Sequence, residues 1–344
     1  MNVGITGQFA SEADLYLKAV KLAEKQINQA GGVNGKQVKV IVQDNQSTNP
    51  GALAALNKNV EQDKVLALIG PVKSTQILAM SDAVKSIGIP MMVGGTNASI
   101  TQAGNPWLFR CRVSDSIAEA VMVKYIKDDM KLTKIGTLFS SEAFGTGAAD
   151  LVDQYAKEQG LTVVSRQAFS PGDRDFMAQL LAIKTAGAEV LVPLSAGHEE
   201  HAAINREYRQ MGSPFKYIST PAIAMKDVLN LSGDAAEGLT GVIEAMPGQS
   251  DTNSKYIASY QQEYNQNADM LGAWTYDALN VLVNAIKKGG EDRGKIKDAI
   301  LATQGYEGVE GTFSFDKYGD GLHQMYVAVI EKGQPKMVKV VKVN

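Results

Sequence analysis

The densest group of titratable side chains is His198-Glu199-Glu200-His201, in which the two histidines lie three residues apart. On a helix this spacing puts both imidazoles on one face, where they and the carboxylates could bind a zinc ion. The same residues also suit the solvated start of a helix, because the helix dipole stabilises acidic side chains in the first turn. We favour this second interpretation and predict no metal site.

Motifs that carry enzymatic or cofactor chemistry are missing. Ser195 follows an apolar run but lacks the glycine two positions earlier that a nucleophile elbow requires. Gly145-Thr146-Gly147 precedes a helical pattern but lacks the third glycine of a dinucleotide fingerprint, and no phosphate loop of the GxxxxGK[ST] type occurs. Cys111 is the one cysteine, which excludes an internal disulfide and a zinc site of several thiolates. The sequence predicts a protein that is not an enzyme and needs no cofactor.

Two loops carry groups that suit a carboxylate ligand. In Gly70-Pro71-Val72-Lys73-Ser74-Thr75, hydroxyls and backbone amides precede a helical pattern, and in Gly94-Gly95-Thr96-Asn97 the glycines let the backbone approach a ligand closely. Each loop follows a strand-like run, and in open parallel sheets ligands bind outside the carboxyl ends of strands. On loop chemistry alone, the simpler interpretation is that Ser74 and Thr96 are helix caps.

Short apolar runs alternate with helix-like periodic runs along almost the whole chain, which predicts βαβ units and mostly parallel sheets. This rhythm breaks at residues 94–112 and restarts near Lys134, so we expect two doubly wound blocks. The expected strands cover residues 2–6, 38–42, 65–69, 89–93, 134–140, 161–166, 189–194 and 215–219, with a closing hairpin at 324–331 and 336–343.

Composition narrows the class of protein further. The chain of 344 residues is long enough for two domains, and its 44% hydrophobic and 21% charged residues are ordinary for a globular protein. Its net charge of −3 comes from mixed acidic and basic residues, which argues against a nucleic-acid partner. No apolar stretch reaches about 18 residues, and no leader precedes the strand at 2–6. We therefore expect a cytoplasmic protein or a mature secreted one whose signal peptide has been removed.

Ten short motifs, taken in their order and spacing over nearly the whole chain, match the pattern of a known protein family. They cover residues 31–35 (GGVNG), 69–71 (IGP), 88–90 (GIP), 96–97 (TN), 104–110 (GNPWLFR), 144–147 (FGTG), 171–176 (PGDRDF), 233–238 (GDAAEG), 276–278 (YDA) and 315–320 (FDKYGD). Together they resemble the solute-binding proteins of branched-chain amino-acid ABC transporters. Each motif is weak alone, but ten in register are a strong signal.

The resemblance implies the α/β type I periplasmic-binding-protein fold, in which two Rossmann-like lobes are joined by three crossover strands and the ligand lies in the cleft between them. Lobe 1 would comprise residues 1–117 and 248–323, and lobe 2 residues 118–247 and 324–344. The resemblance also implies a periplasmic receptor that captures an amino acid or small carboxylate and delivers it to an ABC permease in the inner membrane. We expect a monomer. The rival hypothesis is a ligand-sensing regulatory protein of the amide-sensor type.

The resemblance also implies ligand-binding residues, each carried over from a matching position. Hydroxyls and backbone groups of lobe 1 would bind the ligand's carboxylate and ammonium, and aromatic and polar side chains would close on it from lobe 2 and from the hinge. The aromatic residues are as well explained by packing in the core between domains. The implied residues are Ser74, Thr75, Gly95 and Thr96 in lobe 1, Phe144 and His198 in lobe 2, and Trp274 and Tyr276 near the hinge.

This sequence departs from the family pattern at three places, which leaves the carboxylate end of the implied site intact and alters the end that would hold the ligand's ammonium. The first loop is shorter than usual and has Glu12 where the family has an aromatic wall, Pro221 aligns with the usual acidic residue, and Lys73 stands at one place of a missing cysteine pair. An ammonium in a closed site needs a carboxylate or several acceptors. Either Glu12 or Glu199 supplies this charge, or the ligand is an amide, an aromatic acid or another small carboxylate.

Overall fold

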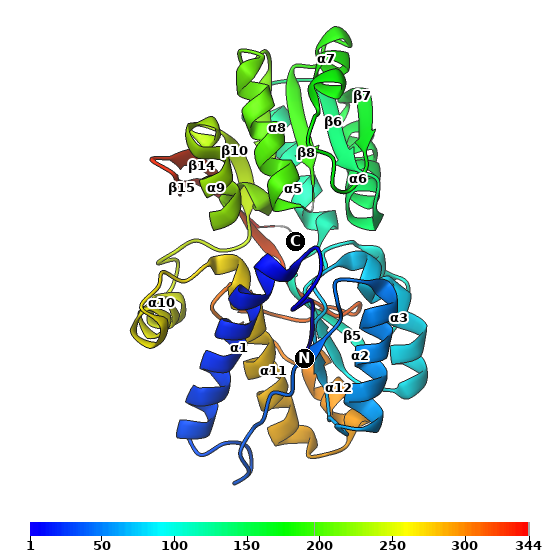
Figure 1. Cartoon of the computed structure of the whole chain (residues 1–344), viewed down its shortest axis with the longest axis vertical. Coiled ribbons are helices and arrows are strands. Elements are labelled where there is room, and N and C mark those ends of the chain that lie inside the picture. The colour runs from blue at the N-terminus through cyan, green and yellow to red at the C-terminus, as the bar shows by residue number, and fades with distance from the viewer. Residues whose placement is uncertain (196, 343–344) are drawn as a thin grey trace. The chain divides into compact units, whose positions relative to one another are not determined.

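The computed structural model describes residues 1–195 and 197–342, and its backbone divides into two compact units (Figure 1). The chain passes from one unit to the other three times, after Ser114, Met246 and Leu322. Unit 1 comprises Met1–Ser114 and Pro247–Leu322, and unit 2 comprises Asp115–Met246 and the chain from His323 onward. Each unit is therefore assembled from segments that are far apart in the sequence.

Unit 1 is built on short parallel strands. Its four-stranded sheet has the order β13-β5-β4-β3, and β1 pairs with β2 in a separate parallel ladder. A short antiparallel pair, β11 and β12, completes the strands of this unit. The bounds are β1 Asn2–Val3, β2 Gln43–Asp44, β3 Leu68–Ile69, β4 Met91–Val93, β5 Leu108–Val113, β11 Tyr306–Glu307, β12 Thr312–Phe313 and β13 Asp320–Leu322.

Helices cover these strands on both sides (Figure 1). On one side, α2 and α3 pack their apolar residues, among them Leu56 and Met80, against Leu68 and Met91 of the sheet. On the other side α1 packs along α11. The helices of unit 1 are α1 Ala10–Gln29, α2 Asn49–Glu61, α3 Ser74–Ile87, α4 Ser99–Gln102, α10 Asp251–Tyr264, the 3-10 helix η3 Met270–Gly272, α11 Ala273–Gly289 and α12 Arg293–Leu301.

Unit 2 contains one seven-stranded sheet with the order β15-β14-β10-β9-β8-β6-β7. Strands β6 to β10 run parallel, and β14 and β15 add an antiparallel hairpin at one edge. The bounds are β6 Lys134–Ser140, β7 Thr162–Phe169, β8 Val190–Leu194, β9 Lys216–Ser219, β10 Thr240–Ile243, β14 Gln324–Glu331 and β15 Gln334–Lys342.

Parallel strands need crossover connections, and in unit 2 these connections are helices. α5 packs against α6, whereas α7 and α8 bury Leu180 and Tyr208 in a core with Leu138 and Leu191 of the sheet. The helices are α5 Asp115–Asp128, α6 Ala143–Gln159, α7 Met177–Thr185, α8 His198–Gln210, η1 Pro221–Ala224, α9 Lys226–Ser232 and η2 Gly233–Ala236.

The sequence pattern located most of these elements, and two differences have physical causes. Residues 38–42 form no strand, because side chains of α1 bind their backbone: Asn28 bonds to both the N–H and the C=O of Val38, and Glu24 accepts from the Val40 N–H. Helix α5 was not expected. It buries side chains around much of its circumference, so its apolar period is weak. Residue 343, the last of the expected strand 336–343, lies outside the described residues.

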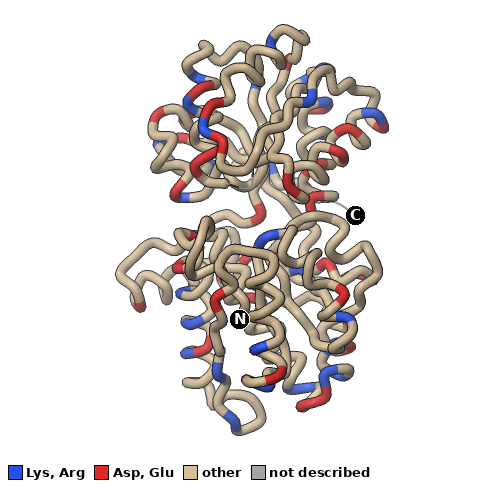
Figure 2. The backbone as a smooth tube through the Cα atoms, turned by 45° about the vertical axis from the view of Figure 1, so that its right-hand side comes forward, with Lys and Arg blue, Asp and Glu red and all other residues tan. Residues whose placement is uncertain are grey.

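Charge is dispersed in both units. Figure 2 shows acidic and basic residues interspersed along the backbone. Across the described ranges, no helix combines the length and the apolar character that a membrane span requires.

Candidate functional site

The two loops predicted to bind a carboxylate contact each other in unit 1. The Oγ of Ser74, the first residue of α3, accepts a hydrogen bond from the Asn97 N–H at 3.3 Å. A Cβ built on Gly95 would lie 3.1 Å from the same oxygen. Ser74 and Thr96 are both buried, and Thr75 is half-buried. These contacts bring Ser74, Gly95 and Thr96 together where β3 and β4 end.

The capping interpretation of these hydroxyls is wrong. Lys73 occupies the N-cap of α3 and Ala98 that of α4, and neither helix has a side-chain cap. The hydroxyl of Ser74 instead bonds to the neighbouring loop. Helix capping therefore does not explain why Ser74 and Thr96 occupy these positions.

Two buried arginines of β5 hold one of these loops, residues 94–97, in place. We call this segment the glycine loop. Arg110 donates from Nη1 to the Gly95 carbonyl at 3.2 Å, and Arg112 donates from Nη1 to the Gly94 carbonyl at 3.2 Å. Residues i and i+2 of a strand share a face, so both guanidinium groups approach the loop from one side. Because the C=O and N–H of a trans peptide point in opposite directions, the N–H groups of Gly95 and Thr96 point away from the arginines. The two arginine contacts therefore fix the direction of these two N–H groups.

Arg110 is itself fixed by a buried network. Its Nε donates to Asp320 Oδ1 at 2.7 Å, its Nη2 donates to Thr101 Oγ1 at 2.8 Å, and Thr101 donates to the same carboxylate at 3.0 Å. The side-chain exposure of Arg110 is 0% and that of Asp320 is 5%. This nearly desolvated ion pair and its hydrogen bonds hold Arg110 in the position from which it donates to the Gly95 carbonyl.

Sequence reasoning missed this role, although Arg110 and Asp320 end two of the motifs. A signal was present, because Arg110 and Arg112 interrupt an otherwise apolar strand. Arginine is rarely buried without a partner. The alternation of arginine with apolar residues therefore indicated that both arginines have partners inside the protein. The sequence did not show which groups these partners are, because they lie on other segments of the chain.

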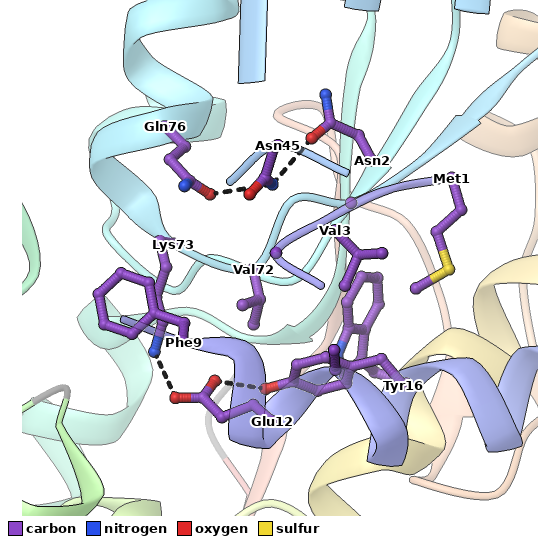
Figure 3. Close-up of a pocket in the computed structure, with 14 residues that line it drawn as sticks. Met1, Asn2, Val3, Phe9, Glu12, Tyr16, Asn45, Val72, Lys73 and Gln76 are labelled. Carbon is purple, nitrogen blue, oxygen red and sulfur yellow. Dashed lines mark hydrogen bonds and ion pairs between the residues drawn. The ribbon is translucent and has the colours of Figure 1, made fainter. Parts of the chain in front are cut away.

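Glu12 and Lys73 form a second, largely buried ion pair in unit 1 (Figure 3). Glu12 Oε1 lies 2.8 Å from Lys73 Nζ, and Tyr16 donates from its hydroxyl to Glu12 Oε2 at 3.1 Å. The Lys73 ammonium also lies 4.1 Å from the centroid of the Phe9 ring, a cation–π contact. Burial raises the pKa of the Tyr16 hydroxyl well above its usual value, and the charge of Glu12 adds to this shift.

A small cavity adjoins this ion pair, with a volume of about 10 Å³. Glu12, Tyr16 and Lys73 contribute to its wall (Figure 3). Trp274 lines the same cavity. The cavity has room for no more than about one water molecule, so it is not itself a pocket for an organic ligand.

Trp274 links this cavity to the glycine loop. Its indole lies where a side chain at Gly94 would have to go, since a Cβ there would be 2.6 Å from Trp274 Cζ2. Its ring centroid is 5.8 Å from that of Tyr16. Tyr276, two residues further along α11, packs on Tyr256 and donates to Gln26 Oε1 at 2.6 Å. This placement favours a core role for Tyr276.

In unit 2, the predicted residues follow the carboxyl ends of parallel strands. Phe144 is half-buried in the first turn of α6 after β6, His198 begins α8 after β8, and Pro221 begins η1 after β9. His198 is buried, with Nδ1 3.5 Å from Asp227 Oδ2. The exposed Glu199 instead pairs with Arg174.

The other histidine of the cluster is structural. His201 is fully buried, its Nε2 lies 2.9 Å from Ser219 Oγ, and burial lowers its pKa to about 3. Glu200 accepts hydrogen bonds from Ser195 at 3.0 Å and from the Gly172 N–H at 2.5 Å. Within the part of the chain that the structure describes, no three His, Cys, Asp or Glu side chains are arranged to hold a metal ion.

Comparison with known proteins identifies the family. The family described as periplasmic binding protein matches residues 1–335. The chain belongs to the periplasmic binding protein family. A curated relative, the leucine-, isoleucine-, valine-, threonine-, and alanine-binding protein of Pseudomonas aeruginosa, is 27% identical, and the match covers 92% of this chain and 84% of the relative.

Solved structures confirm the predicted type I periplasmic-binding-protein fold, and with the curated relative they confirm the resemblance to the solute-binding proteins of branched-chain amino-acid ABC transporters. The leucine-binding protein LivK of Thermotoga maritima superposes with a TM-score of 0.91 at 24% identity, covering 99% of this chain and 97% of that one. The branched-chain amino-acid transporter substrate-binding protein LivJ of Streptococcus pneumoniae, solved with isoleucine, gives 0.90 at 25% identity and covers 99% and 98%.

Proposed function

We propose that this protein is an extracytoplasmic receptor that binds an amino acid or a related small carboxylate and delivers it to the permease of an ABC importer. The observation that carries this proposal is the glycine loop of unit 1, whose two amides are oriented by Arg110 and Arg112 beside the hydroxyl of Ser74. Oriented N–H donors with an adjacent hydroxyl suit a carboxylate. Membership of a solute-binding family supports the delivery step.

The ligand's carboxylate is assigned to Ser74, Thr75, Gly95 and Thr96. In unit 2, Phe144 and His198 lie at the corresponding ends of parallel strands, and we assign them contacts to the same ligand. Binding leaves the ligand chemically unchanged. The receptor acts as a monomer outside the cytoplasmic membrane, and its partner is the permease rather than a nucleic acid.

A thermal-shift screen against amino acids, amides and aromatic and aliphatic carboxylates tests this function. A ligand that binds only the folded state stabilises it by about 2.7 kcal/mol at a hundredfold excess over Kd. We expect stabilisation by at least one carboxylate, and chromatography should recover that ligand unchanged. Stabilisation by amides alone, or by no member of the panel, would contradict the proposal.

Variants in the two units locate the site. Thr96→Val and His198→Ala should each weaken binding of the carboxylate found in the screen, and Lys36→Met serves as a control because Lys36 lies in an ion pair with both side chains at least 70% exposed. Wild-type affinity in His198→Ala would remove unit 2 from the site. Wild-type affinity in Thr96→Val would remove the glycine loop.

A further inference from the structure

The chain supplies an ammonium group of its own beside the predicted carboxylate site. Lys73 immediately precedes Ser74, and its side chain bends toward Glu12 and Phe9 (Figure 3). The side-chain exposure of Lys73 is 11% and that of Glu12 is 6%, so the charges are largely desolvated. Such a pair is held strongly, because removal of one partner leaves a buried charge without compensation.

A ligand's ammonium would need the same partners that Lys73 already has. A primary ammonium in a desolvated site requires a carboxylate or several acceptors, and an aromatic face adds to its stabilisation. Glu12 was the first candidate for this role, and Lys73 and Tyr16 occupy one oxygen each. A second ammonium at Glu12 would be repelled by Lys73.

The acidic side chains at the predicted site of unit 2 are engaged as well. Glu199 is 65% exposed and pairs with Arg174, and Asp227 faces the imidazole of His198. Glu200 accepts hydrogen bonds from Ser195 and from the Gly172 N–H. Pro221 offers neither a charge nor an N–H.

We propose that Lys73 is a specificity-determining residue whose ammonium takes the place of a ligand's α-ammonium on Glu12 and Phe9, so that the ligand of this protein is a carboxylate without an α-ammonium group. The inference rests on the proposed function and narrows its ligand class. Lys73 thereby excludes α-amino acids, while the amides of Gly95 and Thr96 still bind the carboxylate.

Matched pairs of probes test the proposal by isothermal titration calorimetry. L-leucine with isocaproate and L-phenylalanine with hydrocinnamate differ only in the α-ammonium. We expect the parent protein to bind the deaminated member of at least one pair about tenfold more tightly, or more, where tenfold corresponds to about 1.4 kcal/mol. Tighter binding of the amino acid in both pairs would overturn this inference and leave the proposed function intact. If the parent binds none of the screened compounds, both fail.

Lys73→Met then shows whether the ion pair causes the preference. Methionine keeps an unbranched apolar stem but frees the carboxylate of Glu12, so amino-acid affinity should rise about tenfold or more relative to the deaminated partner. The double variant Glu12→Gln/Lys73→Met removes the acceptor charge too and should show no such gain. An equal gain in both variants would mean that added space, rather than the freed carboxylate, admits the amino acid, and would refute the proposed role of Lys73. Lys36→Met, in the exposed pair with Glu291, should keep the parent's preference.

Discussion

Replacing Arg110 by methionine should strongly destabilise unit 1. The substitution keeps much of the apolar stem but removes the guanidinium, which leaves the buried carboxylate of Asp320 without its ion-pair partner. Breaking a buried pair in this way costs about 3–5 kcal/mol. The Gly95 carbonyl loses a donor at the same time. Since small domains are stable by about 5–15 kcal/mol, a large part of the stability of unit 1 is at stake.

Tryptophan fluorescence during urea unfolding measures the loss of stability in unit 1. The chain has two tryptophans, Trp107 and Trp274, and both belong to unit 1. The double variant Arg110→Met/Asp320→Asn should recover part of the loss, because it leaves no uncompensated charge. Lys36→Met should leave the unfolding midpoint unchanged, since its ion pair is exposed. If Arg110→Met lowers the free energy of unfolding by less than about 1 kcal/mol, the reasoning that Arg110 anchors the glycine loop is wrong.

Three further predictions concern binding and pH. Thr96→Val should raise Kd by about 10- to 150-fold, from the loss of about 1.5–3 kcal/mol for a hydrogen bond to a charged group, and calorimetry should show it at unchanged melting temperature. Burial raises the pKa of Asp277 from 3.8 to about 7, so folded unit 1 keeps a proton that the unfolded chain loses above pH 4. The free energy of unfolding of unit 1 should therefore fall from pH 4 to pH 7. Urea unfolding of Asp277→Asn should show a smaller fall over the same pH range. Burial lowers the pKa of His201 from 6.5 to about 3, so unit 2 should lose stability as pH falls below 6.5, and circular dichroism of His201→Phe should show a weaker loss. If a variant and the parent show the same dependence of stability on pH, the pKa shift assigned to the replaced residue is wrong.

Local sequence patterns predicted most of the helices and strands, because the spacing of apolar residues reflects which face of an element is buried. The strand Lys134–Ser140 and the first hairpin strand Gln324–Glu331 have the bounds expected from the sequence. The pattern failed where a side chain replaces a strand partner, as Asn28 does for Val38. Periodicity reports that a segment is buried, but it does not report which group satisfies its backbone.

The candidate site was predictable in its loops and not in its ion pairs. Glycines and hydroxyls after strands point to Ser74 and Thr96 because local chemistry suffices there. The partner of Glu12 is Lys73, 61 residues away, and the partner of Arg110 is Asp320, 210 residues away. No spacing rule connects residues at such separations, so Glu12 looked available for a ligand's ammonium when only the sequence was considered.

The interleaved construction of the two units has a consequence for the order in which they can fold. All five parallel strands of unit 2 lie in one continuous segment, Asp115–Met246. In unit 1, helix α1 must wait for α11, where Trp274 packs on Tyr16 and Thr275 donates to the Tyr16 carbonyl across 259 residues. Closing such long loops is slow, and their entropy cost precedes any reward from contacts. As the chain emerges from the ribosome, its first long helix therefore keeps an uncovered apolar face until more than three quarters of the 344 residues have been made.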